Sequence, residues 1–232
     1  EYGYSNRLLA ETKWGILLST EENILRLLEI LKDKGVYINQ VEGHKLSIGQ
    51  GLNLSREYVI DSALIREFTF LSDAKIPFMT NADGAPFELS KTERFLIDGS
   101  RLNRKQIAQL HSRRIKIFSS DLTTKVEPIL ILPRGISRHF CALNKARAYS
   151  ASFIDIYDSS GLLESDSTIT LNLWVFLNSS VAWLLREISG RKNLGGGLLK
   201  AEAADLNQFP ICLLYTSPSP RDLSTSRMPS SA

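Results

Sequence analysis

Apolar residues recur at intervals of three and four in three segments, and this spacing predicts helices. The first helix spans residues 20–34, where a capping box begins at Ser19. The second spans residues 103–112. The third has about four to five turns and ends at Gly190, a position typical of a left-handed helix terminus. Its apolar face comprises Trp174, Leu177, Val181, Leu184 and Ile188.

Short strands and turns occupy most of the remaining sequence. Apolar runs and alternations predict strands at residues 36–38, 46–52, 58–60, 95–97, 114–118, 128–133, 149–157 and 209–211. Proline and glycine turns between residues 73 and 100 exclude long helices there. The predicted fold class is therefore α+β, with an irregular, turn-rich β region packed against a few helices.

A basic, glycine-rich segment follows the third predicted helix. It runs Arg191, Lys192, Asn193, Leu194, Gly195, Gly196, Gly197, with Lys200 shortly after it. Three glycines permit close backbone approach, and cations beside an amide suit phosphate oxygens and base edges. Composition alone favours a flexible surface turn. The segment is nevertheless the first candidate for a DNA contact.

Charge is distributed unevenly, although the net charge is only +3. Residues 1–100 carry 11 Lys or Arg against 15 Asp or Glu, whereas residues 101–147 carry 11 against 2. A basic segment between acidic ones is typical of a nucleic-acid-binding face, although a solvated surface can have the same composition. Within it, the buried strand at 128–133 continues into further candidate contacts, which are Arg134, Gly135, Arg138 and His139.

Other chemistry is sparse. Before residue 212 the sole cysteine is Cys141, which excludes an internal disulfide and fits a reducing cytoplasm. The three histidines and this cysteine lack paired-ligand spacing, so no metal site is predicted. No apolar run approaches the roughly 18 residues that span a bilayer, so we expect no membrane segment. Hydroxyls that can reach phosphate or base edges are expected at Tyr149, Ser150, Ser152 and Tyr157.

Two passages resemble a known family. The sequence NSS, a helix and then SGRKNLGGGLLKAEAADLNQFPI resembles the end of the target-recognition region of TaqI-like adenine-N6 DNA methyltransferases, which belong to type II and fused restriction-modification systems. Gly49, Gln50 and Gly51 resemble the opening of that region, although Asn53-Leu54-Ser55 replaces its usual Thr-Gly pair. The likeness is strongest over residues 130–211.

The resemblance implies a division of labour. In this family an N-terminal domain binds S-adenosylmethionine and methylates a flipped adenine, while the C-terminal region selects the sequence. The Asn/Asp-Pro-Pro-Tyr/Phe motif and a glycine-containing cofactor loop do not occur in residues 1–211, so we expect no catalytic or cofactor-binding residue here. Double-stranded DNA is the implied partner, with a restriction endonuclease, fused or separate, as a second one. The expected location is the cytoplasm.

These observations predict three parts of the chain. Residues 1–35 are expected to be a helical connector from a missing upstream catalytic domain, and residues 36–211 to be the DNA target-recognition domain. Residues 212–232 include CLLYTSPSPRD and then SRMPSSA, which resemble the translation of a sequencing adapter. This tail is therefore left out of the fold prediction.

Two alternatives remain open. A specificity subunit of a type I restriction system is a non-catalytic binding module, and long helices between two recognition repeats would identify it; no internal repeat occurs here. An unrelated hydrolase or RNA-binding protein would need a nucleophile motif such as GxSxG, or clustered exposed aromatic residues. Neither is evident in the sequence.

Overall fold

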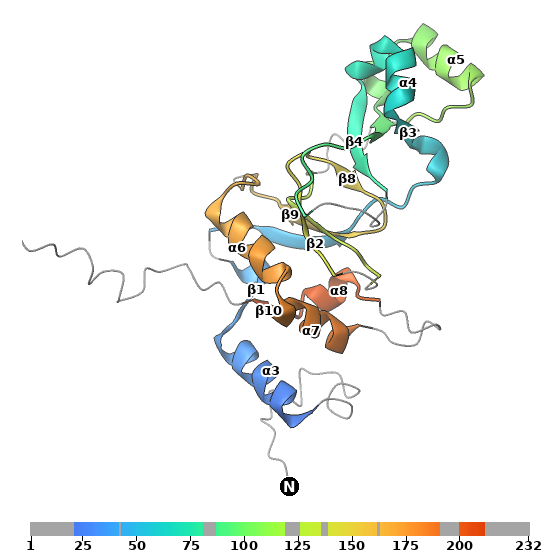
Figure 1. The fold of residues 1–232 in the computed structure, drawn as a ribbon. Coiled ribbons are helices and arrows are strands. Elements are labelled where there is room, and N and C mark those ends of the chain that lie inside the picture. The colour runs from blue at the N-terminus through green and yellow to red at the C-terminus, as the bar shows by residue number, and fades with distance from the viewer. Residues whose placement is uncertain are drawn as a thin grey trace, which may run out of the picture.

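The computed structural model describes residues 21–41, 43–80, 87–118, 126–135, 139–161, 163–190 and 200–211. These residues have an α+β fold, as predicted, with two four-stranded sheets and one two-stranded sheet (Figure 1). The helices are α3 (Glu22–Lys34), α4 (Ser62–Glu67), α5 (Arg104–Ser112), α6 (Thr168–Leu177), α7 (Ser180–Ser189) and α8 (Ala203–Leu206).

The larger core combines an antiparallel sheet with α3, α6, α7 and α8. The strand order is β2 (Leu46–Gln50), β9 (Ile154–Asp158), β6 (Leu130–Leu132) and β7 (Ala142–Leu143). All three side chains of β6 are buried, which confirms the strand predicted within residues 128–133. Leu173, Leu177 and Leu185 contribute the helical side of this core.

A smaller lobe surrounds the second sheet. Its strand order is β3 (Ile60–Asp61), β5 (Arg94–Ile97), β4 (Lys75–Met79) and β8 (Tyr149–Ser150). Helices α4 and α5 contribute to a separate core that includes Leu71, Ile97 and Leu110. In Figure 1 this lobe lies at the opposite end of the molecule from α3. Helix α5 confirms the helix predicted at residues 103–112. Asn103 caps its first turn, and the Asn103 and Gln106 side chains form a capping box.

The strands at the two ends of the predicted recognition domain pair with each other. Strand β1 (Val36–Tyr37) is antiparallel to β10 (Pro210–Ile211), so residues 36–211 close on themselves. A Cβ at Gly35 would lie 2.8 Å from the Pro210 Cβ and 2.4 Å from the Leu31 carbonyl oxygen. Glycine is therefore required where α3 meets this strand pair.

The third predicted helix is two helices. α6 and α7 are bent by 62° at Asn178 and Ser179. The Asn178 side chain accepts from the Cys141 N–H at 2.9 Å and donates to the Cys141 carbonyl at 3.0 Å, while the Ser179 hydroxyl caps α7. These tertiary bonds and the new cap favour a break that apolar periodicity does not reveal.

Four further predictions of local structure were wrong. The capping box predicted to begin at Ser19 is not the start of α3, because the helix begins at Glu22 and Glu21 precedes it without a side-chain cap. Gly190 is extended (φ −70°) rather than left-handed. Residues 114–118 form no strand, since Arg114 has φ +60° and only Phe118 makes a β-bridge. The strand predicted at 149–157 is divided between the two sheets at Ser152, where φ is +57°.

Within the described residues, no single helix is long and apolar enough to cross a membrane, and only α6 and α7 taken together meet that criterion of length and composition.

Candidate nucleic-acid interface

The end of β6 pairs with the segment that precedes α8. Gly135 forms an antiparallel β-bridge with Lys200, and the Ala201 N–H donates to the Arg134 carbonyl at 3.0 Å. Gly135 immediately precedes residues 136–138, and Lys200 immediately follows residues 191–199. The structure therefore brings the flanks of both predicted DNA-contact segments to one place, which we call the seam.

Glu202 holds the two cations of the seam. The Arg134 Nη2 lies 2.7 Å and the Lys200 Nζ 2.9 Å from the same Glu202 Oε1. The hydrogen bond from Arg134 is the main reason that the pKa of Glu202 is lowered, and the bond from Lys200 acts in the same direction. One carboxylate between two cations leaves a net positive charge, and Glu202 orients the Arg134 guanidinium.

Arg186 joins the two sides of the turn that contains Arg134. It is fully buried in α7, where its guanidinium donates to the Pro133 carbonyl and lies 3.2 Å from the His139 Nδ1. Since a guanidinium can only donate, the His139 Nδ1 accepts. Pro133 and His139 lie on either side of residues 134–138, so this buried arginine links both ends of the turn.

His139 is neutral at physiological pH. Burial is the main cause that lowers its pKa to about 4, and the positive charge of Arg186 lowers it further. The ring stacks on Trp183, with centroids 5.9 Å apart and planes 5° from parallel. Trp183 is half exposed, so an aromatic face lies at the surface beside the seam. His139 therefore contributes a neutral, packed ring and no cation for a phosphate.

The predicted site residues divide into two groups. The structure brings Arg134, Gly135 and Lys200 together at the seam, and Arg186 links His139 to Pro133, which precedes Arg134. The others lie outside the described residues, and their contacts stay a prediction; these are Arg138, Arg191, Lys192, Asn193, Gly195, Gly196 and Gly197.

Two of the four hydroxyl groups predicted to reach DNA instead donate to a buried carboxylate. The Ser150 Oγ donates to the Asp155 carboxylate at 2.7 Å, and the Tyr157 hydroxyl donates to it at 3.0 Å. Ser150 is fully buried, and only Ser152 of the four residues is exposed. The prediction is therefore wrong for Ser150 and Tyr157, because a buried carboxylate needs their hydrogen bonds.

The glycines of the SIGQG passage pack against this buried cluster. A Cβ on Gly51 would lie 2.2 Å from the Ser150 Oγ, and one on Gly49 would lie 3.1 Å from the Tyr157 ring. The first contact is too close for any side chain, and the second is tight. This packing gives both glycines a structural role, which requires no contact with DNA.

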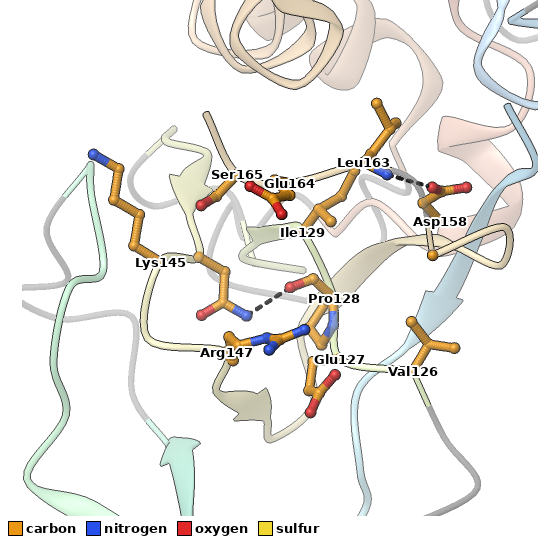
Figure 2. Close-up of a pocket in the computed structure, with 12 residues that line it drawn as sticks. Val126, Glu127, Pro128, Ile129, Lys145, Arg147, Asp158, Leu163, Glu164 and Ser165 are labelled. Atoms are coloured by element: carbon orange, nitrogen blue, oxygen red, sulfur yellow. Dashed lines mark hydrogen bonds between the residues drawn. The ribbon is translucent and has the colours of Figure 1, made fainter. Parts of the chain in front are cut away.

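A separate pocket lies beside residues 126–129 and has a volume of about 380 Å³ (Figure 2). The Asn144 amide donates to the Pro128 carbonyl, and the Asp158 carboxylate accepts from the Leu163 N–H, so two of its polar side chains are held by backbone groups. Its charged residues have both signs and it offers no aromatic wall.

Sequence reasoning missed Arg186, Trp183 and Glu202. The signal for Arg186 was its place four residues after Ala182, on the buried face of α7, where a charged residue is unusual. Glu202 lies at a helix start two residues after Lys200, a pattern too common to be specific. Nothing in the sequence distinguished Trp183, which does not lie on the predicted apolar face of the helix.

Comparisons with known proteins agree with this architecture. No family model and no curated protein matches the chain. Among solved structures, the chain is similar to the type IIG restriction endonuclease BpuSI, with a TM-score of 0.52 and 14% sequence identity over 80% of this chain. The chain spans about a quarter of the length of that enzyme, since the match covers 25% of it. At this identity the likeness shows a shared fold.

Proposed function

We propose that this chain is the DNA sequence-recognition portion of a site-specific adenine-N6 DNA methyltransferase from a restriction-modification system. The observation that carries the proposal is the seam, where the flanks of two basic segments meet at Gly135 and Lys200. Flanks held together on a packed scaffold suit a duplex, because recognition requires several contacts held in register. The fold shared with part of a restriction endonuclease supports the same class of partner.

Catalysis lies outside these residues in this proposal. The sequence lacks the family's catalytic tetrapeptide. A separate domain would bind the cofactor and receive the flipped adenine, while Arg138, Arg191, Lys192 and Asn193 contact the duplex. A restriction endonuclease, fused or separate, would be the second partner.

The type I specificity subunit is less well supported. Such a subunit would need long helices between recognition repeats, and the longest helix among the described residues is α3, with 13 residues. The same residues contain one copy of the two-lobed arrangement. A methyltransferase recognition domain requires neither feature.

DNA binding by the 232-residue chain tests the proposal. We expect selection from a randomised duplex pool to enrich one short adenine-containing site, with affinity that falls as salt rises. Arg191→Ala with Lys192→Ala should reduce the slope of log affinity against log salt by about two, because each lost phosphate contact removes about 0.9. The matched control is Arg26→Ala with Lys34→Ala on the exposed face of α3.

Three results would contradict the proposal or one of its parts. Absence of DNA binding would exclude a recognition domain and favour an unrelated protein. An equal change in slope for the loop variant and the α3 control would show that binding depends on net charge and not on the loop. Salt-sensitive binding without enrichment of any site would exclude sequence recognition by this chain in isolation.

A further inference from the structure

A second basic surface lies at the tip of the smaller lobe, and Figure 1 shows its helix α5 remote from α8, the helix that follows the seam. Residues 101–118 contain six Lys or Arg and no Asp or Glu. They form α5 and the turn that follows it. The concentration of one sign of charge on a single short helix and turn is unusual in a chain whose net charge is +3.

Half of these cations have carboxylate partners. Arg101 pairs with Asp98 at 3.1 Å, Arg113 pairs with Glu67 at 3.3 Å, and Lys116 pairs with Glu57. The other half, Arg104, Lys105 and Arg114, are exposed and take part in none of the ion pairs between described residues.

Arg114 occupies a backbone position that favours glycine. It follows the last turn of α5 with φ +60°, its N–H donates to the His111 carbonyl at 2.9 Å, and the Ile115 N–H donates to the Leu110 carbonyl at 3.1 Å. These bonds define a Schellman motif, whose left-handed residue is usually glycine because a Cβ is strained there. An arginine at this position lowers stability, so its side chain is the feature to explain.

An open hollow beside Arg114 suits an anionic group. Its volume is about 620 Å³, and its walls include His111, Arg114, Lys116 and the Tyr58 ring. Glu57 is the one carboxylate among the residues that line it. Lys116 lies 5.5 Å above the centre of the Tyr58 ring, which holds the ammonium group at the rim.

Arg104 and Lys105 extend this surface along α5. They lie in its first turn, where the helix dipole disfavours cations and where no acidic residue is present. At 1.5 Å per residue they are roughly 15 Å from Arg114, a separation that lets the two ends of α5 reach different phosphates of one duplex. Both ends of the helix therefore present cations at some expense in stability.

We propose that Arg104, Lys105 and Arg114 contact the sugar–phosphate backbone of the duplex that the seam recognises, as a second and sequence-independent contact surface. The inference rests on the proposed function, since the partner is the same DNA. The hollow beside Arg114 receives one phosphate, and the first turn of α5 contacts others on the same strand.

The salt dependence of DNA binding by the 232-residue chain tests this surface. Arg114→Gly should lower the salt slope by about one and Arg104→Gln with Lys105→Gln by about two, which makes the loss of affinity between 50 and 200 mM salt about 3.5-fold smaller per lost contact. Arg114→Gly should also keep or raise Tm, by up to about 4 °C, because glycine relieves the strain. Arg26→Gln with Lys34→Gln is the control for net charge.

The outcomes separate this inference from the proposed function. If the unaltered chain binds no DNA, the proposed function fails. If it binds, and the α5 variants keep its slope or match the α3 control, the inference alone fails. Arg104→Gln with Lys105→Gln changes only exposed side chains and removes cations from the first turn of α5, so the test stands even if Arg114→Gly misfolds. A smaller slope in both α5 variants, with Tm maintained in Arg114→Gly, supports the second surface.

Discussion

Asp155 should make the folded state less stable as pH rises, and Asp155→Asn should remove this effect. The carboxylate is almost completely buried, and it accepts hydrogen bonds from the hydroxyls of Ser150 and Tyr157. Burial raises its pKa from 3.8 to about 6, and these two hydrogen bonds offset part of the increase. Asparagine keeps the shape and accepts a hydrogen bond without a charge.

The direction of this pH dependence follows from the number of protons that the folded and unfolded states bind. Below a pH of about 4 the carboxyl is protonated in both states, and above about 6 it is ionised in both, so between these values the folded state binds more protons. Stability therefore falls as pH rises through this window. A pKa shift of about two units, at 1.36 kcal/mol per unit, lowers the free energy of unfolding by about 3 kcal/mol across this window. Asp155→Asn has no ionisable group at this position and should not show this loss.

Urea unfolding of both proteins at several pH values, followed by tryptophan fluorescence, measures the effect. The stability of Asp155→Asn relative to the unaltered chain should increase by about 3 kcal/mol between pH of about 4 and about 7. His139→Gln is the control. Burial lowers the His139 pKa to about 4, so the contribution of His139 to the stability of the folded state rises with pH over the same window. The difference for that variant should have the opposite sign. A pH-independent difference for Asp155→Asn would refute a raised pKa.

Three further substitutions test individual contacts. Glu202→Gln removes the carboxylate between Arg134 and Lys200, so DNA affinity should rise and the salt slope should steepen by about one in a titration series; weaker binding would show that Glu202 orients a required contact. Tyr157→Phe should lower unfolding free energy by about 1 kcal/mol in urea with DNA affinity unchanged, and a selective loss of affinity would restore its hydroxyl as a contact. Asn178→Ala should cost about 2–4 kcal/mol, since it leaves backbone groups unpaired at the bend, and a loss below about 1 kcal/mol in the same assay would contradict that role.

Much of the fold could be predicted because apolar periodicity records burial. The strand at 128–133, the capped helix at 103–112 and the pairing segment at 209–211 each carry a local signal, and all three are present. The same periodicity passes through Asn178 without interruption, although the helix bends there. The bend depends on backbone groups of Cys141, which are 37 residues away and leave no trace in the local pattern.

The candidate site was predictable only in outline for the same physical reason. Basic residues next to glycine identify segments that can approach a phosphate, but the partner of each cation depends on the tertiary fold. Arg134 was expected to face a ligand and is paired with Glu202, 68 residues away. Arg186, which lies on the buried face of α7 with Ala182 and Leu185, joins Pro133 to His139 and so links both ends of the turn that carries Arg134. A buried arginine without a carboxylate partner in the described structure gains little stability from its charge. Its value is geometric, because it holds two backbone segments in one position, and that position determines where the flanks of both predicted DNA-contact segments meet.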